Sequence, residues 1–127
     1  MRVFLVRHAE AVPGEPDALR PLSPAGRDAA RALGEMLAGE GLDAVVSSPL
    51  RRARETAEAV AEAAGLKAET HEGLGPGATG TSLRDAVAGR GETIAVVGHQ
   101  PDCGDIVEEI TGERRAFAPG TYAELEL

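Results

Sequence analysis

The stretch Val3-Phe4-Leu5-Val6-Arg7-His8-Ala9-Glu10 decides how the rest of the chain is interpreted. Its apolar half predicts a buried strand, and this strand breaks off at an arginine and a histidine. In open α/β sheets, ligands bind in the crevice beyond the carboxyl ends of the strands. Arg7 and His8 would lie in such a crevice, or they are simply the first solvated residues after a strand. The dipeptide alone does not decide between these two interpretations.

A second stretch is Ser47-Ser48-Pro49-Leu50-Arg51-Arg52-Ala53-Arg54-Glu55-Thr56-Ala57. Ser48 is a suitable N-cap and Pro49 a suitable first residue for a helix. The three arginines would then lie in the first two turns, where the helix dipole disfavours each exposed positive charge by about 0.3–1 kcal/mol. Glu55 and Glu58 could offset this through pairs at helical spacing, which describes a solvated basic turn. Equally, an anion held by backbone N–H groups and arginine could bind there.

A third stretch, Thr93-Ile94-Ala95-Val96-Val97-Gly98-His99-Gln100-Pro101-Asp102, repeats the arrangement. A β-branched run ends at Gly98 and His99, and a helix is expected to follow. A lone histidine after a strand is more often structural than catalytic. Here, however, cationic or titratable groups stand at three strand-to-helix junctions. This repetition favours one anion-binding site built from all three.

Taken together, the stretches resemble the histidine phosphatase superfamily, also called phosphoglycerate mutase-like. Arg7-His8-Ala9 is similar to its Arg-His-Gly/Ala motif, and Gly98 to Pro101 is similar to its Gly-His-x-Pro motif. Ser47 to Ala57 is similar to its motif Ser-Ser-Pro-x-x-Arg-Ala-x-x-Thr-Ala. Arg20 to Gly26, Arg-Pro-Leu-Ser-x-x-Gly, further resembles the short SixA-type phosphohistidine phosphatases. The resemblance covers essentially the whole chain.

The resemblance implies a phosphatase that forms a phosphohistidine intermediate. His8 would attack phosphorus as neutral imidazole, and Arg7, Arg52 and His99 would bind the phosphoryl oxygens. Water would then hydrolyse the intermediate. By the motif, the family's second arginine is Arg52, which directly precedes Ala53, whereas Arg51 and Arg54 are not part of it.

The general acid is less clearly specified by the family pattern. Many members carry a glutamate after the third strand that protonates the leaving oxygen, and Glu72 lies near that place. The motif around Glu72 matches poorly, so a solvated loop residue is the alternative. When the substrate is phosphohistidine, the leaving group is an imidazole nitrogen that is readily protonated, so a general acid is needed less.

The expected substrate is therefore phosphohistidine in a protein. A small-molecule phosphomonoesterase is the alternative enzyme, and a catalytically weak module that binds phosphate or phosphoproteins is the alternative outside enzymes. Mutase activity is least favoured, since the chain has no large insertion to hold a bisphosphate. No cofactor and no metal are expected.

Length and composition fit a single histidine phosphatase domain over residues 1–127. The net charge of -8 argues against nucleic acid or an anionic membrane as partner, and favours a phosphorylated protein or small phosphorylated substrate held by local arginines. One cysteine, no visible signal peptide and no long apolar run predict a cytoplasmic protein.

The elements alternate between strand and helix, which predicts a three-layer α/β sandwich with a mostly parallel central sheet flanked by helices. The alternating C-terminal run predicts an antiparallel edge strand. The loops 11–22 and 73–82 are candidate pocket rims. The expected strands are 2–6, 44–46, 67–71, 93–98 and 121–127. The expected helices are 24 to about 39 or 41, 49 to about 64, 83–88 and 102–111.

Two competing sites are disfavoured. Gly75-Pro76-Gly77-Ala78-Thr79-Gly80 matches the dinucleotide fingerprint G-x-G-x-x-G, but no apolar strand precedes it and Pro76 removes a backbone donor. His99 and Cys103, with His8, do not complete a metal ligand set. Cys103 is expected to be a small buried apolar residue, and His71 a surface histidine with no role.

Overall fold

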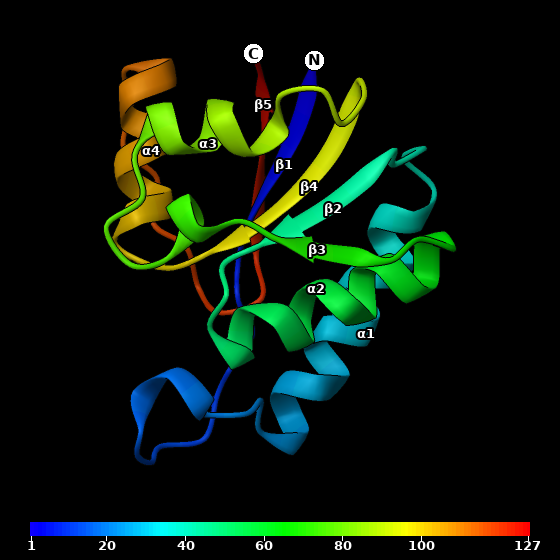
Figure 1. Ribbon diagram of the computed structural model, residues 1–127, viewed down its shortest axis with the longest axis vertical. Coiled ribbons are helices and arrows are strands. Elements are labelled where there is room, and N and C mark those ends of the chain that lie inside the picture. The colour runs from blue at the N-terminus through cyan, green and yellow to red at the C-terminus, as the bar shows by residue number, and fades with distance from the viewer.

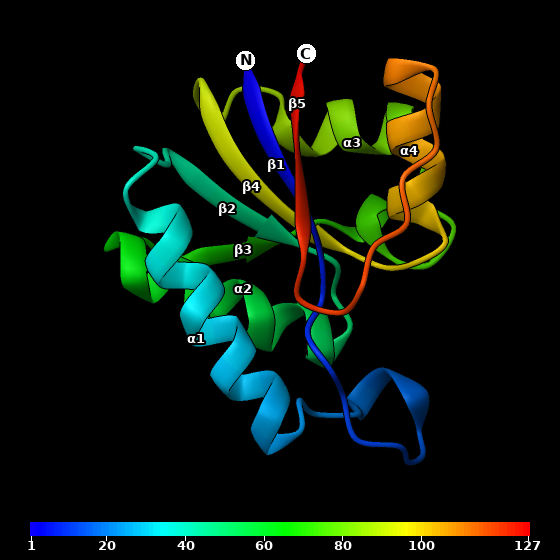
Figure 2. The same ribbon diagram turned by 180° about the vertical axis from the view of Figure 1, so that it is seen from behind.

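The computed structural model describes residues 1–127 and contains one five-stranded sheet with helices on both faces (Figure 1 and Figure 2). The strand order is β3-β2-β4-β1-β5. The first four strands are parallel to their neighbours, and β5 is antiparallel to β1 at the edge. This confirms the predicted fold class. The strands are β1 (Arg2–Arg7), β2 (Ala44–Ser47), β3 (Ala68–Thr70), β4 (Thr93–Gly98) and β5 (Tyr122–Glu126).

The helices begin and end largely where the sequence predicts. Ser23 caps α1, and its Oγ accepts a hydrogen bond from the Gly26 N–H at 3.0 Å. Gly65 closes α2 in the left-handed conformation, with φ +73°. The four α-helices are α1 (Pro24–Ala38), α2 (Arg51–Ala64), α3 (Gly80–Val87) and α4 (Asp102–Thr111), and the two short 3₁₀ helices are η1 (Asp17–Leu19) and η2 (Glu72–Leu74). None of the helices is both long enough and apolar enough to cross a membrane.

The sheet divides the core into two apolar layers. Successive side chains of β1 point to opposite faces, so Val3 and Leu5 pack with α3 and α4, whereas Phe4 and Val6 pack with α1 and α2. Both views show the two helix pairs on opposite sides of the sheet. Burial on both faces fixes the register of β1, and with it the position of the residues that follow the strand.

The start of α2 differs from the sequence prediction. Ser48 is not its N-cap and Pro49 is not its first residue, because the helix begins at Arg51 after Leu50, which makes no side-chain cap. The Ser48 hydroxyl instead accepts the Leu50 N–H at 3.2 Å and contacts His99. A tertiary contact thus replaces the expected local cap.

Two further expectations need correction. The helix α3 begins at Gly80 rather than Leu83, because Thr79 and Ser82 form a reciprocal capping box. His71 is half-buried, and its Nδ1 accepts the Gly73 N–H at 3.1 Å, so it caps η2 instead of being a histidine without a role.

Candidate active site

The parallel pairing of β1 and β4 places the two predicted histidines side by side. Arg7 is opposite Gly98 in the register, so the next residue of each chain segment, His8 and His99, leaves the sheet at the same edge. The His8 N–H donates to the Gly98 carbonyl at 3.0 Å. The two imidazole rings lie edge to face, with centroids 5.2 Å apart.

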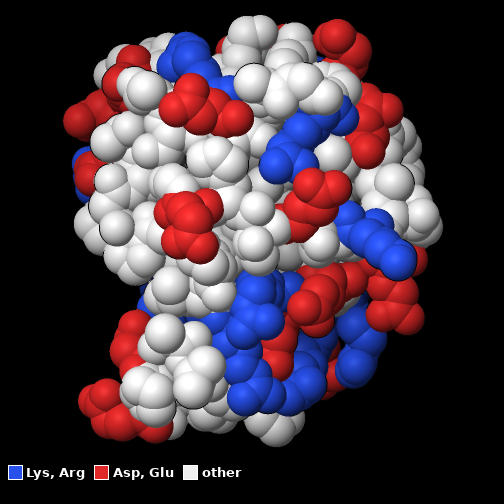
Figure 3. Space-filling model, in the orientation of Figure 1, with Lys and Arg blue, Asp and Glu red and all other residues white.

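These residues border a cavity of about 430 Å³ at the carboxyl ends of the strands. The structure brings to the wall of this cavity all four residues that were predicted to attack or bind the phosphoryl group, namely Arg7, His8, Arg52 and His99. Both predicted rims contribute as well, through residues of the 11–22 loop and of the 73–82 segment. The glycine-rich segment that matches the dinucleotide fingerprint is therefore a loop at the cavity edge. Figure 3 shows an indentation of the surface between the lower part of the molecule in that view and the larger part above it.

His8 is held as a neutral ring with one nitrogen free. Its Nδ1 lies 2.8 Å from the Ala9 carbonyl oxygen, which can only accept, so Nδ1 carries the proton and Nε2 the lone pair. Burial lowers the pKa of His8, and the guanidinium groups of Arg52, Arg7 and Arg20 lower it further, against the opposing effect of the Ala9 bond. A neutral imidazole with an available Nε2 is the form needed for nucleophilic attack.

The two arginines are fixed by different partners. Arg7 donates from Nη1 to the Phe117 carbonyl at 2.7 Å, while its Nε is buried and has no protein partner. Arg52 is 7% exposed and donates to the Asp17 carbonyl at 2.9 Å and to the Asp17 carboxylate at 3.2 Å. Both guanidinium groups still have N–H donors that an oxyanion could use.

His99 is buried, with its Nε2 2.8 Å from the Ser48 hydroxyl. Burial lowers the pKa of His99 to about 4, with smaller contributions from His8 and Arg52, while Asp17 acts in the opposite sense. At neutral pH this ring is therefore uncharged. The cavity therefore presents His99 as a neutral N–H donor rather than as an imidazolium.

Sequence reasoning missed several residues at the cavity. Asp17 and Arg20 border it from the η1 loop, and Gln100 and Asp102 border it from the start of α4. Arg20 lies in the quoted Arg-Pro-Leu-Ser motif, which could have pointed to it. Asp17 has no comparable signal, because its contact with Arg52 spans 35 residues of chain.

The remaining candidates lie elsewhere. Glu72 is exposed in η2 and does not border the cavity. Arg51 pairs with Glu55 at 2.8 Å, and Arg54 donates to the Pro49 carbonyl at 3.0 Å, both outside the cavity. Cys103 is buried, and burial raises the pKa of its thiol to about 12, in keeping with a small apolar core residue.

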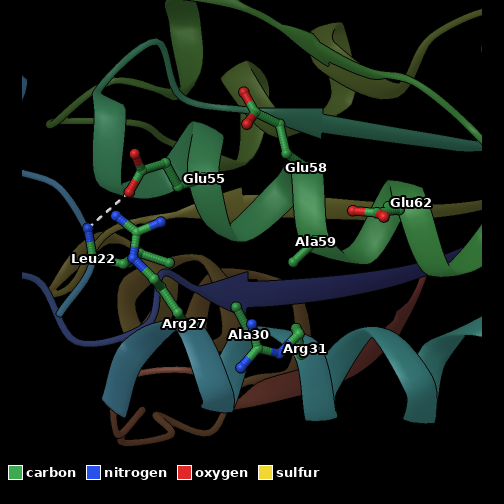
Figure 4. Close-up of a pocket in the computed structure, with 8 residues that line it drawn as sticks. All are labelled: Leu22, Arg27, Ala30, Arg31, Glu55, Glu58, Ala59 and Glu62. Carbon is green, nitrogen blue, oxygen red and sulfur yellow. Dashed lines mark hydrogen bonds between the residues drawn. The ribbon is translucent and has the colours of Figure 1, made fainter. Parts of the chain in front are cut away.

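A smaller groove of about 250 Å³ runs between α1 and α2 and has no histidine in its wall (Figure 4). Arg27 and Arg31 border it from α1, and glutamates border it from α2. Glu55 accepts the Leu22 N–H there at 2.8 Å. This carboxylate thus ties the end of the 11–22 loop to α2.

Comparison with known proteins identifies the family of the chain. The model of the histidine phosphatase superfamily, branch 1, matches residues 3–81. The chain belongs to this superfamily. A phosphohistidine phosphatase SixA homolog from Haemophilus influenzae is 33% identical over 98% of this chain and 87% of its own length.

Solved structures place this histidine phosphatase in the SixA-type branch. The protein histidine phosphatase SixA in complex with tungstate superposes with a TM-score of 0.82, at 25% identity over 99% of this chain and 95% of that one. A SixA structure from Nakamurella multipartitia gives 0.83, at 29% identity over 97% and 82% of the two chains. The α-ribazole phosphatase from Shigella flexneri, at 19% identity over 100% and 91% with a TM-score of 0.74, shares the fold.

Proposed function

We propose that this histidine phosphatase removes the phosphoryl group from phosphohistidine in a protein, through a phosphohistidine formed on its own His8. The observation that carries the proposal is the free Nε2 of a neutral His8 in a cavity walled by Arg7, Arg52 and His99. Phosphoryl transfer needs little more than an in-line nucleophile and groups that stabilise charge on the phosphoryl oxygens.

The reaction takes two displacements. In the first, His8 Nε2 forms a bond to phosphorus while the P–N bond to the substrate histidine breaks, and the leaving nitrogen takes a proton from solvent. In the second, water attacks phosphorus and loses a proton, the bond to Nε2 breaks, and inorganic phosphate leaves. Arg7, Arg52 and His99 would donate to the equatorial oxygens in both steps.

Three observations support this substrate class. Relatives carry the name phosphohistidine phosphatase, and one of them was solved with tungstate, a tetrahedral oxyanion that resembles phosphate. The cavity opens at the surface between the 11–22 loop and the 73–82 segment, so a side chain on a protein surface could reach it. Glu72 lies away from the cavity, which suits a leaving nitrogen better than a poor alkoxide leaving group. The lone buried cysteine also suits the reducing cytoplasm as the location.

The test is to trap the intermediate. After brief incubation with ³²P-labelled phosphohistidine protein, wild type should carry label that is stable in alkali and lost in acid. His8→Ala should carry none and release no phosphate, while His71→Ala, which removes a histidine outside the cavity, should behave as wild type. Label on any other residue would overturn the mechanism.

A release assay on the same preparations decides between the substrate classes. Phosphohistidine proteins and a panel of small phosphate esters would be compared by kcat/KM. Preference for the esters would make the chain a small-molecule phosphomonoesterase. Absence of turnover on every substrate at neutral pH would leave a phosphate-binding module.

A further inference from the structure

Ser48 contacts His99, one of the proposed site residues, and its side chain has only two hydrogen-bond partners. It follows β2 directly, and none of its surface is exposed. Its Oγ is 3.2 Å from the Leu50 backbone nitrogen and 2.8 Å from His99 Nε2. The first of these groups can only donate a hydrogen bond.

The position of each proton follows from these contacts. The Leu50 N–H uses one acceptor site of the Ser48 oxygen, so the hydroxyl proton needs an acceptor of its own. The buried site offers His99 Nε2 and no other acceptor. If Nε2 instead carried a proton, that N–H would point at the hydroxyl and the buried O–H would be left without a partner, at a cost of about 1–3 kcal/mol.

We propose that Ser48 is a positioning residue that donates its hydroxyl proton to His99 Nε2 and thereby fixes His99 as the Nδ1–H tautomer. The other ring nitrogen, Nδ1, has no protein partner, and it is not among the fully buried unpartnered atoms. With its proton fixed there, His99 presents an N–H donor, whereas the opposite tautomer would present a lone pair that repels phosphoryl oxygens.

The two neighbouring histidines then share one tautomer and perform opposite tasks. His8 donates from Nδ1 to the Ala9 carbonyl and presents the lone pair of Nε2. His99 accepts at Nε2 from Ser48 and presents the proton of Nδ1. One hydrogen bond at Nδ1 thus leaves His8 as a nucleophile, and one hydrogen bond at Nε2 leaves His99 as an uncharged donor. That His99 donates to a phosphoryl group rests on the proposed function, whereas its tautomer does not.

The tautomer can be measured without turnover. Two-dimensional ¹H–¹⁵N spectra of the imidazole rings, recorded at about pH 8 where an ordinary histidine is neutral, distinguish a protonated nitrogen from one with a lone pair. His99 should have its proton on Nδ1. His71 is an internal reference for the other tautomer, because its Nδ1 accepts the Gly73 N–H. Signals are assigned by loss in His71→Gln and His8→Gln, and a proton on His99 Nε2 would overturn the proposal.

Variants of two adjacent serines test the consequence for activity. Ser48→Ala should let His99 populate the Nε2–H tautomer and lower kcat by about 10- to 100-fold, as is typical when the partner that orients a functional histidine is lost. Ser47→Ala is the matched control, since Ser47 is equally buried and its hydroxyl bonds only to the Ser48 backbone carbonyl, at 2.9 Å. Ser48→Thr, which keeps the hydroxyl, should keep the tautomer.

The outcomes separate this proposal from the proposed function. An unchanged His99 tautomer in Ser48→Ala, with kcat equal to that of Ser47→Ala, would overturn the role of Ser48. Should Ser48→Ala fail to fold, the wild-type and Ser48→Thr spectra still decide the tautomer. If wild type hydrolysed no substrate but His99 carried its proton on Nδ1, the proposed function would fail and the tautomer assignment would stand.

Discussion

The three arginines at the start of α2 have different surroundings although they are nearly adjacent in sequence. Only Arg52 points into the cavity, and Arg51 and Arg54 are held by local partners on the outer side of the helix. Arg52→Ala should therefore lower kcat/KM by about 10²–10³-fold, the usual cost of removing one donor to developing charge. Arg51→Ala and Arg54→Ala are matched controls with small losses. Equal small losses at all three positions would mean that the basic turn is only a solvated surface.

Glu72 gives a second prediction at this scale. The side chain is exposed and outside the cavity, so Glu72→Gln should leave phosphohistidine hydrolysis within a few-fold of wild type. Simple alkyl phosphates should be poor substrates for both proteins, because an alkoxide needs a proton in the transition state. Efficient hydrolysis of alkyl phosphates by wild type, with a loss of about 10²–10⁴-fold in Glu72→Gln, would instead identify a general acid.

At the scale of elements, η1 carries an anion that competes for the proposed phosphate site. The Asp17 carboxylate lies between two arginines, 3.0 Å from Arg20 Nη1 and 3.2 Å from Arg52 Nη2. Both arginines lower the pKa of Asp17, with Arg20 the larger cause, so the carboxylate is charged at neutral pH. A phosphoryl group that binds Arg52 would have to share or displace this partner.

Removing the charge of Asp17 should therefore strengthen phosphate binding. In Asp17→Asn, inorganic phosphate should inhibit about two- to fivefold more strongly than in wild type, as expected when an exposed carboxylate no longer competes for Arg52. Asp28→Asn is the control, because Asp28 pairs with Arg31 on α1 and its loss changes the net charge equally. Weaker inhibition in Asp17→Asn alone would mean that Asp17 chiefly holds Arg52 in place.

Elements whose signals are local could be predicted from the sequence. Ser23 with Pro24 fixed the start of α1, Gly65 the end of α2, and the alternation of 121–127 the edge strand. The contact of Ser48 with His99 could not, because the two residues are 51 positions apart and the serine had an equally good local use as a cap. Asp17 was missed for the same reason, since a polar loop has no periodicity from which its partner could be inferred.

At the scale of the whole molecule, the fold gathers positive charge in one cavity although the net charge of the chain is negative. The chain carries a net charge of -8, yet β1, the start of α2 and the η1 loop bring Arg7, Arg52 and Arg20 to one cavity. Figure 3 shows basic side chains gathered mainly in the lower half of that view and interleaved with acidic ones. The positive field that we expect to attract an oxyanion is therefore confined to this cavity, in contrast to the net negative charge of the chain.

The stability of the whole fold should depend on the two histidines that border the cavity. The folded pKa of His99 is about 4, below its ordinary 6.5, and burial lowers that of His8 as well. Between these pH values the unfolded chain binds protons that the folded protein does not, so the free energy of unfolding should fall as pH drops from about 6.5 toward 4. Carboxylates with lowered pKa, such as Asp43 and Glu55, lose their contribution only at more acidic pH.

Urea denaturation between pH 7 and about 5 therefore isolates the histidines from the carboxylates. Wild type should lose stability steadily across this interval. His99→Gln should show a shallower dependence even if it is less stable overall, because glutamine takes up no proton on unfolding. An equal slope in both proteins would mean that folding does not lower the pKa of His99, and that burial of this ring does not exclude its proton between pH 7 and about 5.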